Sequence, residues 1–347
     1  MKVNRLAFVE ALNKVMPGIE KEAILLEGAN SFMFDEDWIK TFNDSISVSY
    51  PFRTGVKCLI KAEEFFKVLS KLEVDEVEME VNDNKLVLKA GNTRIKMVMM
   101  KEDLFLLGDS LFREDNKWFA LSDKFKEALR SCVMVSTSDQ MYSNLWGVSI
   151  GKDGLISSDN FRAAWYHLNM EEEFVLPVNA AKELARIEDL IEYSQNEAWV
   201  HFHNKKGLCF STRKINNNFP RNDIKGLLDS SKFSDEDLYI FPKGMVKLVE
   251  RVSIFASPLQ DREDEYIQIQ LDEEGNLLIK GLREFGEIED KIPPDGIWKF
   301  PVDFILTINP KYLWSMLSVG NEFYLSENNL ILIKGANFDG AISLVML

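Results

Sequence analysis

The sequence predicts an α+β protein built from three tandem, structurally similar units, each with two amphipathic helices and runs of short strands. Two observations predict this class. A pair of helical apolar stripes occurs in the same order three times, and a strand-rich segment follows the second stripe of each pair. One stripe is typical of any globular helix, whereas this recurrence indicates an internal repeat. The 347 residues then divide into domains at 1–117, 118–236 and 237–347.

The first helix of each unit is predicted from apolar residues at i, i+3, i+4, i+7 and i+8 spacing. The stripe that begins at Phe8 recurs from Phe125, and again from Met245 with one polar lapse at Ser253. The stripes consist of Phe8, Ala11, Leu12, Val15 and Met16; of Phe125, Ala128, Leu129, Cys132 and Val133; and of Met245, Leu248, Val249, Val252 and Ser253.

The second helix of each unit is predicted in KAEEFFKVLSKL, NAAKELARIEDL and NPKYLWSMLSVG, where Gly320 is expected to form a C-cap. An insertion around IPPDGIWKFPVDF explains the longer final spacing. A strand run with polar turns follows each helix. These runs are VEMEVNDNKLVLKAGNTRIKMVMM, AWVHFHNKKGLCFSTRKI and EFYLSENNLILIKGANFDGAISLVML.

The composition excludes several classes of protein. Lysine and arginine total 41 against 56 acidic residues, and 41 − 56 gives a net charge of −15. This balance argues against a simple basic protein that coats nucleic acid, although a segregated basic surface could still meet a polyanion. Cys58, Cys132 and Cys209 are too widely spaced for a disulfide framework, so we expect a reducing, cytoplasmic setting. Neither a signal-peptide pattern nor a membrane-spanning apolar stretch is expected.

A search for catalytic motifs predicts a protein that is not an enzyme and has no cofactor or metal. The chain has no phosphate-binding loop, nucleophile elbow, HExxH or Rossmann fingerprint. His201 and His203 alternate on one predicted strand and offer a metal-assisted hydrolase as an alternative. No third ligand has suitable spacing, so we consider this alternative less favoured.

Cations recur on the predicted helices of this acidic chain. Each helix alone could be an ordinary solvated face, but the recurrence favours helices gathered around a polyanion. Contacts of this kind would be made to phosphates, independent of sequence and sensitive to salt. The candidate residues are Lys14, Lys67, Lys126, Arg130, Lys182, Arg186, Lys247 and Arg251.

The repeat order and three local segments resemble the bacterial DNA sliding clamp, the beta subunit of DNA polymerase III. MYSNLWGVSIGKDGLISSDNFRAAWYHL resembles the family's Leu-x-Gly strand followed by a T-D-G-H-R-L turn. INNNFPRNDIKGLL resembles its G-R-F-P-D-Y segment, and SLVML resembles its short hydrophobic tail. The turn at 158–163 replaces the family's glycine, histidine and leucine, Arg221 replaces an aspartate, and the tail lacks a proline. These departures indicate a divergent member, such as one encoded by a phage.

The resemblance implies a head-to-tail homodimer that closes six domains into a ring around double-stranded DNA. Such a processivity factor tethers the replicative DNA polymerase and raises its effective concentration at the primer end. The resemblance also implies a separate ATP-dependent clamp loader, and polymerase and loader would both bind through short linear motifs. A non-encircling protein-interaction scaffold of three repeats is the other alternative.

The resemblance also implies a pocket for partner peptides between the middle and last units. An apolar slot suits a linear motif with hydrophobic anchors, although these residues could instead seal the domain junction. We expect Phe161 and Lys225 to make the slot narrower or more polar. The pocket residues are Leu145, Ser158, Asn160, Phe161, Ala163, Pro220, Ile224 (or Lys225), Leu344 and Met346.

The predicted subunit interface pairs the first unit of one chain with the third unit of the other. In TRIKMVMM, strand alternation places Ile95 and Met97 on one face, at positions that the family uses as a subunit edge. The partner surface is predicted near the end of a third-unit helix, at Ile254, Phe255 and Leu259. Three units per chain close a six-unit ring when unlike ends meet twice.

Overall fold

The computed structural model describes residues 1–20, 27–100, 117–231, 233–258 and 265–346. It has an α+β fold, and the chain divides into two compact units. Unit 1 comprises Met1–Lys126 and Asn179–Ile215, and unit 2 comprises Glu127–Val178 and Asn216–Leu347. In the described ranges, no helix has both the length and the apolar character needed to cross a membrane.

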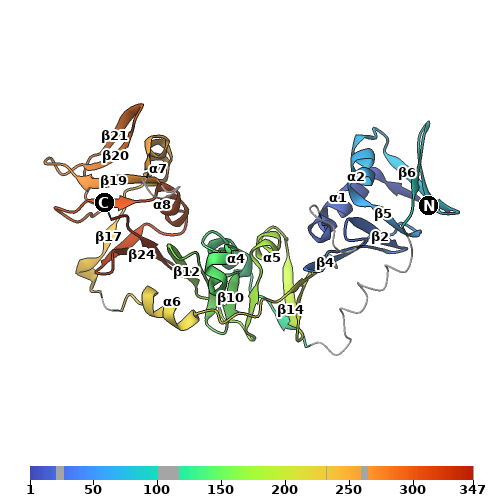
Figure 1. The fold of residues 1–347 in the computed structure, drawn as a ribbon, viewed down its shortest axis with the longest axis horizontal. Coiled ribbons are helices and arrows are strands. Elements are labelled where there is room, and N and C mark those ends of the chain that lie inside the picture. Colours follow the sequence, from blue (N-terminus) through green and yellow to red (C-terminus); the bar gives the residue numbers. More distant parts are fainter. Residues whose placement is uncertain (21–26, 101–116, 232, 259–264, 347) are drawn as a thin grey trace. The chain divides into compact units, whose positions relative to one another are not determined.

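Unit 1 packs its two amino-terminal helices side by side on a phenylalanine core. The helices are α1 (Arg5–Val15) and α2 (Ala62–Lys71), which contact each other in the upper part of the blue region of Figure 1. The Asn4 side chain caps α1 by accepting a hydrogen bond from the Ala7 amide at 2.9 Å. The Phe8 ring lies 5.8 Å from Phe65 and 5.7 Å from Phe34, so helix and sheet share one core.

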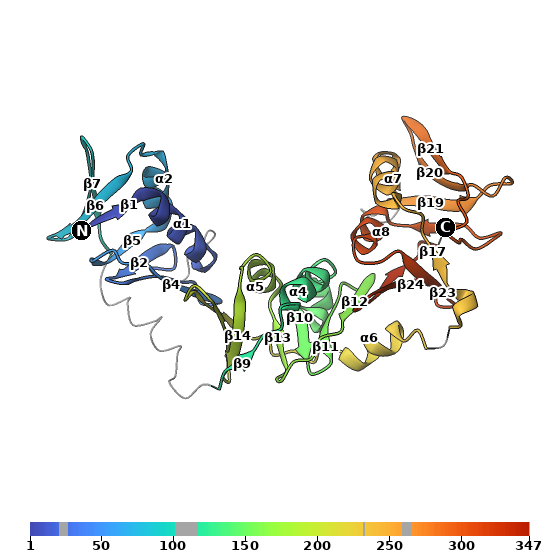
Figure 2. The ribbon, with the colours of Figure 1, turned by 180° about the vertical axis from the view of Figure 1, so that it is seen from behind.

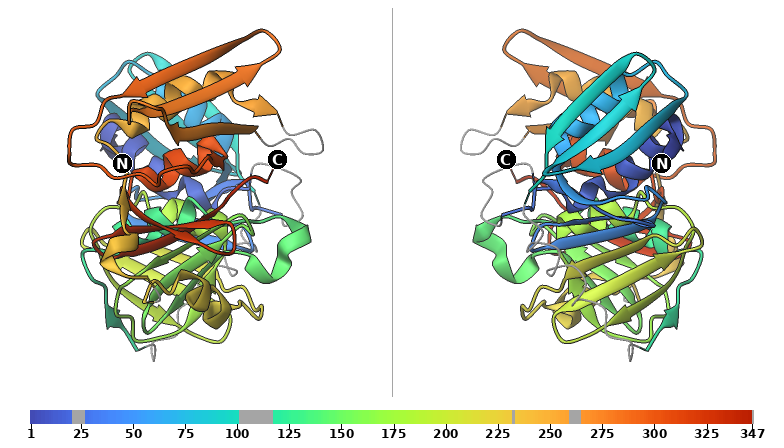
Figure 3. Two further views of the ribbon diagram at one scale, coloured as in Figure 1. Left: turned by 90° about the vertical axis from the view of Figure 1, so that its left-hand side faces the viewer. Right: turned by 90° about the vertical axis from the view of Figure 1, so that its right-hand side faces the viewer.

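Two antiparallel sheets complete unit 1. The smaller has the order β1-β6-β7-β8 and the larger has the order β5-β2-β3-β4-β16-β15-β14-β9. Figure 3 (right) shows the first sheet in cyan. The bounds are β1 (Lys2–Asn4), β2 (Ser31–Asp35), β3 (Trp38–Phe42), β4 (Ile46–Pro51), β5 (Lys57–Lys61), β6 (Glu76–Asn82), β7 (Lys85–Ala90), β8 (Thr93–Val98), β9 (Phe119–Ala120), β14 (Leu190–Gln195), β15 (Trp199–Asn204) and β16 (Cys209–Arg213).

Unit 2 repeats the plan with α7 (Met245–Val252) and α8 (Pro310–Leu317) in contact with each other (Figure 2). The Asn309 side chain caps α8 through the Lys311 amide at 2.9 Å. A further helix, α6 (Arg221–Leu228), packs on β11, β12 and β25. The helices α4 (Phe125–Val133) and α5 (Val178–Leu184) each cross a residue number at which the units divide.

Unit 2 also has one long and one shorter sheet. The long sheet has the order β13-β10-β11-β12-β25-β24-β23-β17, and the other has β18-β19-β20-β21 with β22 beside β19. The bounds are β10 (Val148–Gly151), β11 (Gly154–Ser158), β12 (Arg162–Tyr166), β13 (Phe174–Leu176), β17 (Tyr239–Ile240), β18 (Ser257–Pro258), β19 (Glu265–Leu271), β20 (Leu277–Arg283), β21 (Gly286–Ile292), β22 (Leu306–Ile308), β23 (Glu322–Ser326), β24 (Leu330–Gly335) and β25 (Phe338–Ser343).

The predicted repeat is confirmed at the level of fold. Each strand run is a three-stranded antiparallel meander, namely β6-β7-β8, β14-β15-β16 and β23-β24-β25. Each long sheet joins strands of two successive repeats, through β4 with β16 and through β12 with β25. The compact units therefore cross the predicted domain boundaries, which stay a prediction.

Gly320 has a role other than the predicted C-cap. The C-cap of α8 is Ser318. A Cβ atom at Gly320 would lie only 2.0 Å from the Lys334 carbonyl oxygen. Glycine is therefore needed here because two backbone segments approach each other closely.

Candidate functional site

The predicted cations lie on or next to the repeated helices, as expected. Lys14 is on α1, Lys67 on α2, Lys126 and Arg130 on α4, Lys182 on α5, and Lys247 and Arg251 on α7, with Arg186 just beyond α5.

Acidic neighbours engage most of these cations. Lys14 pairs with Glu10 at 2.9 Å and donates to the Tyr50 hydroxyl at 3.0 Å, and Arg186 pairs with Glu183 at 2.8 Å. Further pairs join Lys67 with Glu63, Lys126 with Glu188, and Arg251 with Asp290. The hydrogen bond to Glu63 raises the pKa of Lys67. The helices therefore carry positive charge that is partly balanced on the protein itself.

Lys182 and Lys247 differ from these residues. Both are exposed, and neither forms an ion pair within the described part of the chain. They are the channel candidates whose charge is least balanced by a direct neighbour.

Three of the predicted pocket residues meet in one buried cluster on unit 2, which we call the α6 cluster. Leu145, Ala163 and Ile224 are 8%, 2% and 6% exposed, respectively. The cluster also contains Ile156, Leu228, Leu332 and Ala341, and Tyr142, Trp165, Phe219, Phe233 and Tyr324 pack against it. Leu227, which precedes Leu228 on α6, is 40% exposed. Helix α6 thus covers an apolar face of the long sheet.

The substituted turn at 158–163 is held by its own hydrogen bonds. Asp159 accepts from the Phe161 and Arg162 amides at 3.1 and 2.7 Å, and the Arg162 guanidinium returns to the same carboxylate. Asn160 has a φ of 74°, a left-handed conformation that asparagine tolerates. Ser158 is buried and donates to the Arg162 carbonyl at 2.7 Å.

This turn directs Phe161 toward helix α8. Its ring lies 6.2 Å from Tyr312 and 6.4 Å from Tyr142, and Tyr142 in turn packs on the α6 cluster. Phe161 therefore borders the cluster at Tyr142. Pro220 stands at the start of α6 as its N-cap residue.

The carboxyl-terminal residues run close to the same turn. The Ser343 amide donates to the Phe161 carbonyl at 2.8 Å, and the Leu344 amide donates to the Asn329 carbonyl at 2.8 Å. Leu344 is half-buried, while Met346 is 77% exposed and its sulfur accepts from the Asn329 side chain at 3.2 Å.

Arg221, which stands where the resembling family segment has an aspartate, is anchored in the β10–β11 hairpin. Its guanidinium donates to the Ser149 and Gly154 carbonyls at 2.8 and 3.0 Å and pairs with Asp153 at 2.6 Å. Lys225, one turn later on α6, pairs with the same carboxylate. Partial burial opposes ionisation, but hydrogen bonds from Lys225 and Arg221 lower the pKa of Asp153 overall. Asp153 is therefore a carboxylate shared by two cations.

The predicted interface residues lie on the edge strand β8 and in the short 3-10 helix, Ser253–Phe255, that follows α7. Ile95 and Met97 are half-buried on β8, an edge strand of unit 1, beside the buried Leu88 and Leu86 of β7. In unit 2, Ile254 is 63% exposed and Phe255 lies 5.2 Å from the exposed ring of Phe285. Leu259 lies outside the described residues. Unit 1 thus carries apolar side chains on an edge strand, and unit 2 carries exposed ones at Ile254 and Phe285.

The two histidines of the hydrolase alternative have structural partners. His201 is fully buried, and its ring nitrogens lie 2.8 Å from the Ser211 hydroxyl and 3.2 Å from the Asn196 amide. Burial, with a smaller contribution from His203, lowers the pKa of His201 to about 4. His203 pairs with Glu192 at 3.2 Å and stacks on Trp118. No group of three or more metal-ligating side chains occurs in the described ranges.

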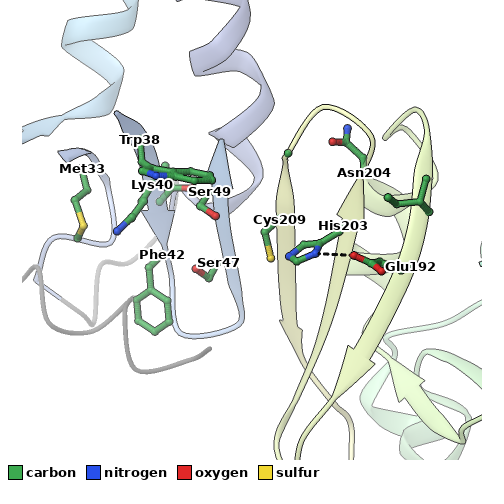
Figure 4. Close-up of a pocket in the computed structure, with 13 residues that line it drawn as sticks. Met33, Trp38, Lys40, Phe42, Ser47, Ser49, Glu192, His203, Asn204 and Cys209 are labelled. Carbon is green, nitrogen blue, oxygen red and sulfur yellow. Dashed lines mark hydrogen bonds and ion pairs between the residues drawn. The ribbon is translucent and has the colours of Figure 1, made fainter. Parts of the chain in front are cut away.

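A hollow of about 600 Å³ adjoins His203 on unit 1. Figure 4 shows Trp38, Lys40 and Phe42 from β3 on one side and the His203–Glu192 pair on the other. Most of its lining residues alternate along their strands with core residues such as Phe34, Val48 and Phe202. The hollow therefore opens mainly on the sheet face opposite to the helices.

The sequence analysis predicted neither helix α6 nor the neighbours of Trp165. The i, i+4 spacing of Ile224 and Leu228 is typical of a helix, but one such pair of apolar residues is weak evidence for it. Trp165 follows the quoted turn, and only the pairing of β12 with β11 and β25 shows which neighbours it meets.

Comparison with solved structures finds full-length similarity to bacterial sliding clamps. The DNA polymerase sliding clamp of Bacillus subtilis matches with a TM-score of 0.81 at 16% identity, over 100% of this chain and 98% of that one. The Helicobacter pylori beta clamp matches with a TM-score of 0.81 at 16% identity, over 100% of both chains. For the Bartonella birtlesii sliding clamp the TM-score is 0.82 at 16% identity, over 100% and 99%. No protein-family model and no curated protein matches the sequence. The chain thus has the sliding-clamp fold over its full length.

Proposed function

We propose that this protein is a DNA sliding clamp: a head-to-tail homodimer that encircles duplex DNA and tethers the replicative DNA polymerase. The observation that carries the proposal is the full-length match of fold, which covers 100% of this chain and at least 98% of the clamps compared. In this proposal the protein acts without catalysis or cofactor, in the cytoplasm with the replicating DNA. A separate ATP-dependent loader opens the ring.

The charge on the helices supports a channel that attracts DNA weakly. Lys67 and Arg186 are paired with acids on or next to their own helices, which reduces their net attraction for phosphate. Lys182 and Lys247 supply unbalanced charge. Weak, sequence-independent phosphate contacts would let a ring slide while topology retains it on the DNA.

Complementary edge strands support the head-to-tail dimer. On β8 the exposed Arg94 and Lys96 alternate with Ile95 and Met97, and on β21 the exposed Glu287 and Glu289 alternate with Ile288 and Asp290. Both strands are at the edge of their sheets in the described structure, with one side of their backbone open to a further strand. A basic edge with apolar neighbours therefore suits an acidic edge on the second subunit.

The α6 cluster supports binding of polymerase and loader by short linear motifs. Its buried centre is flanked by side chains that are only partly buried, and Leu227 and Met346 are exposed. Hydrophobic anchors of a peptide would extend this apolar surface. The proposal keeps the predicted pocket residues, with Phe161 and the chain end at its border.

Retention on blocked DNA tests the proposal without the unidentified loader. The protein is threaded at high concentration onto linear duplex with biotin at both ends, and the ends are then closed with streptavidin. A clamp should remain bound through gel filtration at moderate salt and should be released when a restriction enzyme cuts the DNA. Protein that stays bound after cutting, or never withstands filtration, would instead fit an ordinary DNA-binding protein or a scaffold.

A further inference from the structure

The long sheets of the two units contain the same hairpin at the same place. Residues 34–50, which include β3 and β4, align without a gap with residues 150–166, which include β11 and β12. Under this alignment the two hairpins have the same cross-strand register. Their turns also share one left-handed residue, Asp44 with a φ of 51° and Asn160 with a φ of 74°. The outer faces of the two sheets can therefore be compared position by position.

The hollow of unit 1 lies at the position that Trp165 occupies in unit 2. Trp165 is on β12, at the junction with β25, and its side chain packs against the α6 cluster. Ser49 is at the matching position on β4, opposite Cys209 of β16, and both residues line the hollow. Unit 1 thus has a small side chain and open space where unit 2 has an indole ring.

The two sides of the hollow are suited to an aromatic ring. Trp38, on β3, is 39% exposed and stands where unit 2 has Gly154, so one wall is built by a large ring. His203, on β15, forms the opposite wall, and the small side chains of β4 and β16 lie between the two (Figure 4). A volume of about 600 Å³ is typical of a ligand site. An aromatic side chain over this floor could contact a ring on each side.

Glu192 gives the wall at β14 an acidic group. Its side chain is 36% exposed, and its carboxylate lies 3.2 Å from the His203 ring nitrogen Nδ1. Lys40 also lines the hollow, but it pairs with Asp35 at 2.8 Å, so much of its charge is balanced by a direct neighbour. A basic side chain next to the aromatic residue would therefore complement Glu192.

We propose that this hollow binds a partner protein through a tryptophan with a neighbouring Lys or Arg: the indole ring enters over Ser49, and the cation pairs with Glu192. Because the hollow opens on the outer face of the sheet, the backbone of a partner segment can lie across its mouth while one side chain enters. The site is built by unit 1 alone. It goes beyond the proposed clamp function by adding a second surface for a protein partner.

Short labelled peptides provide the probe. The peptide Gly-Ser-Trp-Lys-Ser-Gly carries fluorescein, and its two twins have Ala in place of Trp or Glu in place of Lys. Fluorescence anisotropy measures their binding to the full chain. We expect the Trp peptide to bind about tenfold more tightly than its Ala twin, because the twin lacks the ring contacts. The Glu twin should bind about threefold more weakly than the Lys peptide, with a difference that shrinks as salt is raised.

Variants at the floor and the wall of the hollow locate the binding. Ser49→Trp should fill the hollow with the chain's own ring, as Trp165 does in unit 2, and abolish the preference for Trp over Ala. Ser70→Trp, at an exposed position of α2, is the matched control and should leave the preference unchanged. Trp38→Ala alters an exposed residue and decides the matter if Ser49→Trp does not fold. It should reduce the preference about fivefold.

Equal binding of the Trp and Ala peptides, or a preference that survives both Ser49→Trp and Trp38→Ala, would overturn the inference. So would free N-acetyltryptophanamide that binds as tightly as the peptide, because the occupant would then be a small aromatic molecule. A preference that appears only after residues 101–116 are replaced by a Gly-Ser linker would identify the chain's own segment as the occupant and would also overturn it. Retention on blocked DNA is a separate readout, so none of these results bears on the clamp proposal.

Discussion

The guanidinium of Arg221 packs against the β10–β11 hairpin and donates hydrogen bonds to two of its backbone carbonyls. Gly151, the last residue of β10, has no side chain, and a Cβ atom there would lie 2.8 Å from the Arg221 guanidinium carbon. The glycine and the arginine therefore depend on each other: the space left by one is occupied by the other.

We predict a non-additive pair of substitutions at this turn. Arg221→Ala should cost about 2 kcal/mol because it leaves partly buried acceptors unpaired, and Gly151→Ala should cost about 1–2 kcal/mol by displacing the guanidinium. In the double variant the new methyl group occupies vacated space, so the total cost should be smaller than the sum. Urea unfolding of the four proteins measures this coupling. Strict additivity would contradict the proposed dependence.

His201 should make stability fall in mild acid. Its pKa in the folded protein is about 4, below the value near 6.5 expected when unfolded. Between these values the unfolded chain binds a proton that the folded chain does not, so this contribution is complete above pH 6.5 and is lost as pH falls toward 4. The loss at pH 5 should be about 2 kcal/mol. His201→Asn should remove this part of the pH dependence in urea unfolding at pH 7.5 and pH 5. An unchanged slope would assign the acid sensitivity to other groups.

At the scale of single residues, the sequence predicted which residues belong to the candidate pocket better than it predicted which neighbours they contact. Leu145, Ala163 and Ile224 could be selected from the resemblance, and they share one cluster. Phe161 could not be placed, because its direction depends on the left-handed Asn160 and on hydrogen bonds within the turn. The shared use of Asp153 by Arg221 and Lys225 also depends on where α6 lies against the β10–β11 hairpin.

Among the secondary-structure elements, the amphipathic helices were the most predictable. Phe8, Ala11, Leu12 and Val15 are all buried, as the α1 stripe predicts, and the second and third repeats follow the same rule at most positions. A long apolar stripe with helical spacing is incompatible with the two-residue alternation of a strand, so it predicts a helix. Helix α6 was missed because only Ile224 and Leu228 form its buried face, and its position depends on the sheet that it covers.

We predict that Lys182 and Lys247, which form no ion pair among the described residues, carry much of the weak attraction for DNA. Reversing Lys182 and Lys247 to Glu should lower affinity for a short linear duplex, measured by anisotropy at low salt. The slope of log affinity against log salt should fall by roughly one for each phosphate contact removed. Lys152→Glu is the matched control, because Lys152 is an exposed lysine that lies in the β10–β11 turn and not on a helix. If that control lowers affinity equally, the channel assignment is wrong.

At the scale of the whole molecule, continuous sheets explain why compact units and sequence repeats differ. Each long sheet takes strands from two successive repeats, joined at β4 with β16 or at β12 with β25. The middle repeat is therefore divided between the two units. The repeat is visible in the sequence because each repeat has similar local patterns of apolar residues. Pairing between repeats instead depends on which edge strands meet in space.

The same principle leads to a test of the dimer by charge exchange. One variant carries Arg94→Glu and Lys96→Glu on β8, and a second carries Glu287→Lys and Glu289→Lys on β21. In a head-to-tail dimer each variant alone brings like charges together at both interfaces, so each should sediment as a folded monomer. Mixed in equal amounts they can form a heterodimer in which one interface has exchanged charges and the other is native.

The mixture should therefore restore the dimer and its retention on blocked DNA, which only pairing of unlike ends can explain. Glu273→Lys, in the turn between β19 and β20, changes charge on the same sheet away from its edge and should leave the dimer intact. Dimers of either charge-exchange variant alone would place the interface elsewhere, because two such repulsive contacts would then have no effect. A mixture that remains monomeric would show that these strands do not face each other. The double substitution Ile95→Asp and Met97→Asp, added to both charge-exchange variants, should prevent the mixture from forming a dimer. It removes the apolar contact that charge exchange leaves in place.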